Sequence, residues 1–108
     1  MSETHLVTSI LQALELEPGV YAWRNSTGMI RRAGRVIKFG AVGSPDILAI
    51  VGPEGRLLGL EAKTSTGKQS PKQCEWQALI DGLGGKYAVV RSVSDALKAV
   101  RDARRGHT

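Results

Sequence analysis

The sequence PDILAIVGPEGRLLGLEAK, residues 45–63, contains two apolar runs separated by a short glycine- and proline-rich segment. The separating residues Gly52 to Gly55 have the composition of a tight turn. We therefore expect one strand from Asp46 to Val51 and a second from Arg56 to Lys63. Together they predict a β-hairpin.

The register of this hairpin brings two carboxylates together. If Val51 faces Arg56 across the turn, counting back along both strands places Asp46 opposite Glu61. Directly opposed side chains have Cβ atoms ~4.5 to 5.5 Å apart, and like charges there are destabilising. A divalent cation removes that repulsion, because Mg²⁺ prefers oxygen ligands, takes few protein carboxylates and leaves positions open for water and phosphate. The hairpin therefore predicts a metal site.

Lys63 joins the same cluster, because alternation along a strand points it to the same face as Glu61. In a phosphodiesterase such a lysine can orient or deprotonate the attacking water and neutralise charge in the transition state. The alternative is that Asp46 caps a turn while Glu61 and Lys63 form a solvated strand face. An isolated Glu-x-Lys triplet favours that alternative, and a one-residue slip would separate the two acids. The ordered combination of Pro-Asp, turn and Glu-x-Lys favours the site.

The remaining elements follow from periodicity and capping residues. Three helices are predicted, over residues 3–16 with Ser2 as N-cap, from Ser70-Pro71 to about 83, and after a cap at Ser94. Further strands are predicted at 20–23, at 87–91, and as a pair within 29–39 that turns at Ala33-Gly34. A basic polar tail is expected from about residue 101 to 108. The pattern predicts one α/β domain over residues 1–108.

The composition favours a nucleic-acid partner and argues against several other classes of function. The formal net charge of +5 points to a polyanionic partner such as nucleic acid. Cys74 is the single cysteine, which excludes an internal disulfide and argues against a zinc site, and the two histidines have no nucleophile motif nearby. We expect a cytoplasmic protein with no membrane segment and no small-molecule cofactor, because signal peptide, apolar span and nucleotide fingerprint are all missing. Trp23 and Trp76 are assigned to packing.

The cations are concentrated before the hairpin. No acidic residue occurs between Glu17 and Asp46, so this basic stretch leads directly into the predicted site. It contains Arg24, Arg31, Arg32, Arg35 and Lys38. Lys68 and Lys72 flank the helix N-terminus at Ser70, which itself attracts phosphate. Any one of these residues is explained equally well as charge protecting a strand edge, but together they predict a DNA-binding surface.

This constellation resembles the VRR-NUC (virus-type replication-repair nuclease) domain of the PD-(D/E)xK nuclease superfamily, of the stand-alone phage or bacterial type. The resemblance spans most of the chain. It is carried by the Glu3 helix, Trp23-Arg24-Asn25-Ser26, Gly43-Ser44-Pro45-Asp46, Glu61-Ala62-Lys63, Ser70-Pro71-Lys72-Gln73 and the segment 85–94. It implies a restriction-endonuclease-like core, with a mixed β-sheet flanked by helices in α-β-β-β-α-β-α order, and cleavage of DNA with Mg²⁺ or, in its place, Mn²⁺.

The resemblance also implies residue roles. It makes Asp46 and Glu61 metal ligands, Lys63 a catalytic residue and Gln73 an active-site residue on the following helix. Glu3 matches an acidic residue of the family's first helix, which implies a further ligand and catalytic group. Glu3 also falls on the helical stripe expected to face the sheet, although an acid in a first helical turn is favoured by the helix dipole alone.

For a chain of this length, the resemblance implies a structure-selective endonuclease acting on four-way (Holliday) junctions. A junction has near two-fold symmetry, so we expect a homodimer with two active sites. Two alternatives remain open. One is a nicking, restriction-like or flap endonuclease with the same chemistry, and the other is a DNA-binding module without catalysis.

Overall fold

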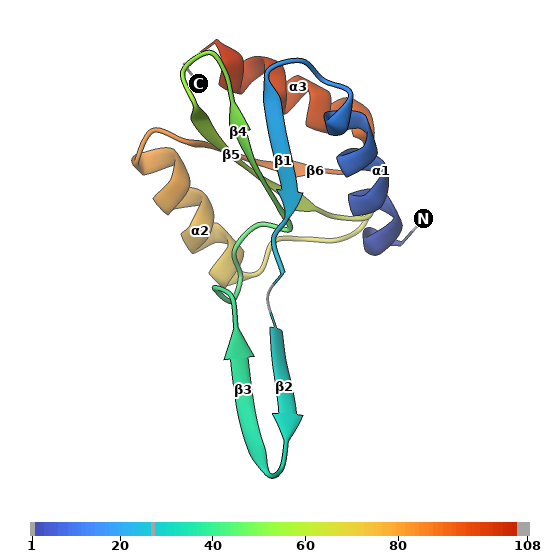
Figure 1. The fold of residues 1–108 in the computed structure, drawn as a ribbon, viewed down its shortest axis with the longest axis vertical. Helices are drawn as coiled ribbons and strands as arrows, with labels where there is room; N and C mark the ends of the chain where they lie inside the picture. Colours follow the sequence, from blue (N-terminus) through green and yellow to red (C-terminus); the bar gives the residue numbers. More distant parts are fainter. Residues whose placement is uncertain (1, 27, 106–108) are drawn as a thin grey trace.

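A four-stranded mixed sheet in the order β1-β4-β5-β6 forms the centre of the fold (Figure 1). The computed structural model describes residues 2–26 and 28–105. The strands of this sheet are β1 (Val20–Arg24), β4 (Ile47–Val51), β5 (Arg56–Ala62) and β6 (Lys86–Val90). β4 pairs antiparallel with both β1 and β5, whereas β6 pairs parallel with β5. The sheet is therefore mixed, as predicted.

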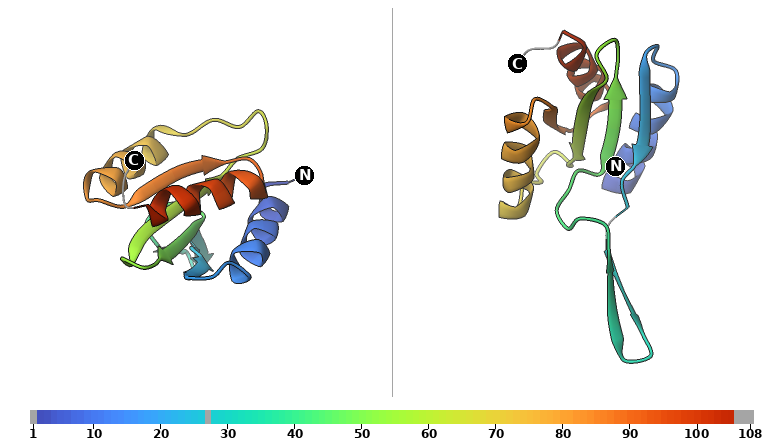
Figure 2. Two further views of the ribbon diagram at one scale, coloured as in Figure 1. Left: turned by 90° about the horizontal axis from the view of Figure 1, so that it is seen from above. Right: turned by 60° about the vertical axis from the view of Figure 1, so that its left-hand side comes forward.

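Three helices cover the two faces of this sheet: α1 (Glu3–Glu15), α2 (Pro71–Gly82) and α3 (Val93–Arg104). Figure 2 shows α1 and α3 on one side and α2 on the other. The hydrophobic core lies between the sheet and the α1/α3 layer, where alternate residues of β4 and β5 are buried. The intervening residues of β5, among them Glu61, consequently face α2. No helix in the described ranges is long and apolar enough to cross a membrane.

The predicted hairpin register is confirmed. Val51 pairs with Arg56, and the ladder continues to the pair Ile47 and Leu60. Asp46 lies one residue beyond that last pair, where its Oδ2 accepts a hydrogen bond from the Ala62 backbone N–H at 2.8 Å. The side chain of Asp46 is therefore held at the end of β5, beside Glu61.

The other two strands, β2 (Gly28–Arg32) and β3 (Arg35–Phe39), form a separate antiparallel ribbon. They turn at Ala33 and Gly34, as predicted, with φ of 52° and 72°. A two-residue hairpin loop with φ above zero at both positions matches the twist of the strands beside it. The ribbon projects away from the body (Figure 1), which helps to give the molecule extents of 48 × 31 × 25 Å. Without it, the elements follow the predicted α-β-β-β-α-β-α order.

The predicted N-caps of the first two helices are confirmed. Ser2 accepts a hydrogen bond from the backbone of His5, and Ser70 accepts one from the backbone of Gln73. Pro71 follows Ser70 at the first helical position, where the missing N–H costs nothing. These local signals fixed the starts of α1 and α2 without help from tertiary structure.

The predicted boundaries of α3 were wrong at both ends. Ser92, not Ser94, is the N-cap, because its Oγ accepts from the Asp95 N–H while Asp95 accepts from the Arg91 N–H. These two bonds satisfy the backbone donors of Asp95 and Arg91. The helix then continues to Arg104 instead of giving way to a tail at 101, since Ala103 extends its buried stripe.

Candidate active site

Asp46 and Glu61 form a carboxylate pair on the face of the sheet toward α2. Glu61 is only 3% exposed. One of its oxygens, Oε2, accepts a hydrogen bond from Gln73 Nε2 at 2.9 Å. The other, Oε1, is buried and has no hydrogen-bond partner. Because a buried polar atom without a partner is costly, this oxygen is suited to a ligand or cation that the chain alone does not supply.

The protonation of Glu61 reflects this environment. Burial, followed by the negative charge of Asp46, raises the pKa of Glu61 from 4.5 to about 8. The positive charge of Lys63 opposes this increase in pKa, and the negative charge of Glu3 adds to it. Near neutral pH, Glu61 therefore holds a proton between crowded acids. A divalent cation favours the ionised form and would take the place of that proton.

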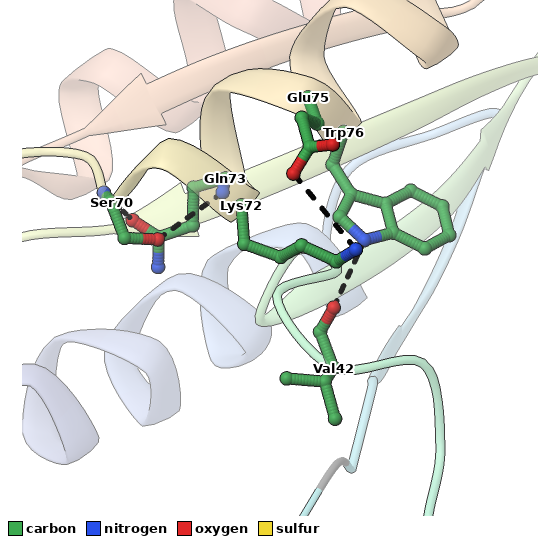
Figure 3. A network of polar contacts seen from close by, with 6 residues as sticks. All are labelled: Val42, Ser70, Lys72, Gln73, Glu75 and Trp76. Atoms are coloured by element: carbon green, nitrogen blue, oxygen red, sulfur yellow. Dashed lines mark hydrogen bonds and ion pairs between the residues drawn. The ribbon is translucent and has the colours of Figure 1, made fainter.

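Gln73 is positioned by the start of α2. The side-chain Oε1 of Gln73 accepts a hydrogen bond from the backbone N–H of Ser70 at 2.9 Å, and the backbone N–H of Gln73 donates to Ser70 Oγ at 3.2 Å (Figure 3). The amide is thus fixed by a capping box, and its remaining end donates to Glu61. The structure places Gln73 beside the carboxylate pair, where the resemblance implied it would be.

Lys63 and Glu3 lie close enough to the pair to change the pKa of Glu61. Lys63 follows β5 and is half-buried, and its backbone N–H donates to Val90 O at 3.0 Å. Glu3 is exposed in the first turn of α1. Within the described residues, no three His, Cys, Asp or Glu side chains gather into a metal-binding group. A direct ligand role for Glu3 therefore stays a prediction, whereas Asp46 and Glu61 are adjacent.

Asn25 holds the loop that leads into the site, a role that sequence reasoning missed. Its Nδ2 donates to Ser44 Oγ at 2.7 Å and to Pro45 O at 2.8 Å, and its backbone N–H donates to Asp46 O at 2.8 Å. Three bonds from one residue thus fix the chain on either side of Pro45. Asn25 lies in the Trp-Arg-Asn-Ser motif of the resemblance, which was the available signal.

Helix α2 supports the same loop from the other side. Trp76 Nε1 donates to Val42 O at 3.1 Å (Figure 3), so Trp76 does more than fill space. The Lys72 side chain lies over Gly43, where an added Cβ would approach its Cγ to 2.4 Å. Gly43 also has φ of 83°, which favours glycine. The start of α2 therefore positions both Gln73 and the loop before Asp46.

The predicted DNA-binding residues separate into two groups. Arg31, Arg32 and Arg35 are exposed on the β2–β3 ribbon, and Arg24 lies at its base with a hydrogen bond to Thr8 Oγ1 at 3.3 Å. The side chain of Lys38 lies outside the described part of the structure. The second group adjoins the start of α2. It consists of Lys68, which is exposed, and Lys72, whose Nζ lies 3.9 Å from Glu75.

Trp23 does not belong to the core. It is 37% exposed on the edge strand β1 and contacts the ring of Tyr21, with ring centroids 6.0 Å apart. Alternation along β1 turns both rings away from the α1/α3 layer. Trp23 therefore packs against Tyr21 on an exposed face of the sheet and does not fill the core.

A solved structure of a VRR_NUC domain resembles this chain with a TM-score of 0.62 and 22% sequence identity. The alignment covers 92% of this chain and 94% of the other. The chain has the fold of a VRR_NUC domain. The expected restriction-endonuclease-like core, a mixed sheet flanked by helices, is thereby confirmed. No protein-family model and no curated protein sequence matches the chain.

Proposed function

We propose that this chain is a metal-dependent DNA endonuclease with Asp46, Glu61 and Lys63 at its active site. The observation that carries the proposal is the buried carboxylate of Glu61, which lies beside Asp46 and leaves one oxygen without a partner. On a VRR_NUC fold, such a pair at the end of two antiparallel strands is best explained as the protein ligands of a metal ion, whose other positions are left for water and phosphate.

Asp46 and Glu61 would hold Mg²⁺ or Mn²⁺. Such an ion lowers the pKa of a bound water and polarises the phosphate it contacts. Gln73 keeps Glu61 Oε2 in place through its hydrogen bond, which leaves the buried Oε1 available to a cation. Lys63 offers a positive charge to the attacking water and to the phosphate oxygens. Glu3 is a candidate for a further acidic group at the same site.

DNA is the proposed substrate, because the net charge is positive and the basic, acid-free stretch from 18 to 45 leads into Asp46. Within that class we favour a four-way junction cut by a homodimer. A nicking, restriction-like or flap endonuclease would use the same residues, since substrate shape is selected by surfaces outside the chemical site. A binding module without catalysis is disfavoured, because clustered carboxylates repel phosphate unless a metal lies between them.

The test is cleavage of matched four-way, flap, duplex and single-stranded DNA with Mg²⁺, Mn²⁺ or EDTA. The wild-type protein is compared with Lys63→Ala, and sedimentation of the wild-type protein measures its oligomeric state. We expect metal-dependent, paired nicks on the junction by a dimer, and no nicks from the variant. Cutting of the other substrates by a monomer would overturn the junction proposal alone. DNA binding without cutting in either metal would overturn the nuclease proposal.

A further inference from the structure

The tip of the β2–β3 ribbon carries an unfavourable concentration of positive charge. Arg32 and Arg35 are direct cross-strand partners, so their side chains lie on one face of the ribbon, and both are exposed. Like charges in this position destabilise a strand pair. The ion pairs found among the described residues include none of the ribbon's arginines, and the sequence from 18 to 45 contains no acid. A polyanion would offset this repulsion.

The ribbon has dimensions that suit one groove of DNA. Its two strands are ~4.8 Å apart and their side chains extend on both faces. The major groove of B-DNA is about 12 Å wide and admits a two-stranded ribbon, whereas the minor groove is only about 6 Å wide. Five-residue strands extend about 17 Å. That length corresponds to roughly five base pairs at 3.4 Å each.

The ribbon is also joined to the loop that leads into the candidate active site. The chain enters it after Asn25 and leaves it through Gly40 to Ser44, the loop before Asp46. Asn25 and Trp76 hold this loop through the hydrogen bonds to Ser44, Pro45 and Val42. A duplex that lies along the ribbon therefore continues directly toward the carboxylate pair.

We propose that the ribbon Gly28–Phe39 enters the major groove of the duplex arm beside the cleavage site. Arg31, Arg32 and Arg35 then contact phosphates and guanine edges within roughly five base pairs of the cut. This inference rests on the proposed function, because it takes DNA as the partner. Beyond that function, it assigns the ribbon as the element that holds the duplex and the major groove as the site of contact.

The first test compares the wild-type protein with the double variant Arg32→Ala/Arg35→Ala. Its matched control is Lys98→Ala/Arg101→Ala, which removes the same charge from α3, at the opposite end of the molecule from the ribbon (Figure 1). We expect the ribbon variant to bind duplex and junction DNA at least about tenfold more weakly. The slope of log Kd against log salt should fall by roughly 2, since two phosphate contacts are lost. KM for DNA should rise in the ribbon variant and not in the α3 control.

The second test identifies the groove with dimethyl sulfate, which methylates guanine N7 in the major groove and adenine N3 in the minor groove. We expect bound wild-type protein to protect guanine N7 on one side of the cut, and the ribbon variant to lose only that protection. Protection of adenine N3 there, or affinity equal to that of the α3 control, would overturn the proposal. The footprint is measured without metal, so it reports binding of DNA independently of cleavage. Failure of the wild-type protein to cut DNA would therefore overturn the proposed function and not the placement of the ribbon.

Discussion

Glu61 is the residue on which the candidate site depends. Its carboxylate is buried, touches Gln73, lies beside Asp46, and has a pKa that responds to both Lys63 and Glu3. The expected hairpin register placed Asp46 opposite Glu61, and strand alternation placed Lys63 on the same face. Neither predicted the burial of Glu61 or the unpartnered oxygen, because both depend on how α2 packs over the strand.

The raised pKa of Glu61 predicts a pH dependence of stability in the metal-free protein. The unfolded chain loses this proton near 4.5 and the folded chain only near 8, so between these values the folded state binds more protons. The free energy of unfolding should therefore fall as pH rises from about 4.5 to about 8, by at most on the order of 5 kcal/mol. Urea unfolding in EDTA at pH 5, 7 and 9 measures this decrease.

Glu61→Gln is the control for that experiment, since an amide resembles the protonated acid and does not titrate. The variant should lack most of the decrease in stability between pH 5 and 9. Added Mg²⁺ should stabilise the wild-type protein more at pH 8 than at pH 6, because the ion competes with the proton. An equal pH dependence in both proteins would refute the assignment of the raised pKa to Glu61.

Two substitutions at Gln73 separate its cap from its contact with Glu61. Gln73→Glu retains the capping-box pattern but places a second acid beside Glu61, whereas Gln73→Ala removes both interactions. We expect Ala to lower the free energy of unfolding by about 1 kcal/mol. Both variants should cut DNA more slowly. Wild-type cleavage rates in Gln73→Glu would show that the contact with Glu61 has no part in the reaction.

Among the elements, the β4–β5 hairpin was predictable and the position of the ribbon was not. The turn residues fixed the pairing of Val51 with Arg56, and the rest of the register followed. The same reasoning found the turn at Ala33-Gly34. Alternation within a hairpin does not indicate whether the hairpin joins a larger sheet, so the separation of β2 and β3 became visible only in the structure.

Gly59 is the contact point between β5, α2 and the loop before Asp46. A Cβ built there would lie 2.7 Å from Pro45 Cγ and 3.1 Å from Ile80 Cδ1. Gly59→Ala should therefore push on the residue before Asp46, lower the free energy of unfolding by about 1 to 3 kcal/mol, and slow cleavage. Thermal unfolding and a cleavage time course measure the two effects.

Gly82→Ala in the last turn of α2 is the matched control. A Cβ at Gly82 meets nothing within 4 Å, and alanine is the better helix former by roughly 0.5 to 1 kcal/mol. This variant should be slightly more stable than the wild-type protein and equally active. If Gly59→Ala behaved in the same way, the packing of Pro45 against β5 would have no role in placing Asp46.

On the scale of the whole molecule, cations and carboxylates occupy separate but connected regions. The sequence predicted this separation through the acid-free stretch before Asp46. The structure carries Arg31, Arg32 and Arg35 of that stretch on the projecting ribbon (Figure 1), whereas Lys68 and Lys72 adjoin the start of α2, where Gln73 contacts Glu61. That division depends on tertiary connections, such as those of Asn25 and Trp76, which periodicity does not encode.

The most direct test of the central claim measures Mn²⁺ binding by electron paramagnetic resonance and DNA cleavage on the same samples. Wild-type protein should bind Mn²⁺ and cut DNA, Glu61→Gln should lose both properties, and Lys63→Ala should keep Mn²⁺ but not cut. This pattern is expected because a carboxylate holds the ion, whereas the lysine acts on water and phosphate. Unaltered Mn²⁺ binding and cleavage in Glu61→Gln would contradict the account, because the buried carboxylate would then not be part of a metal site.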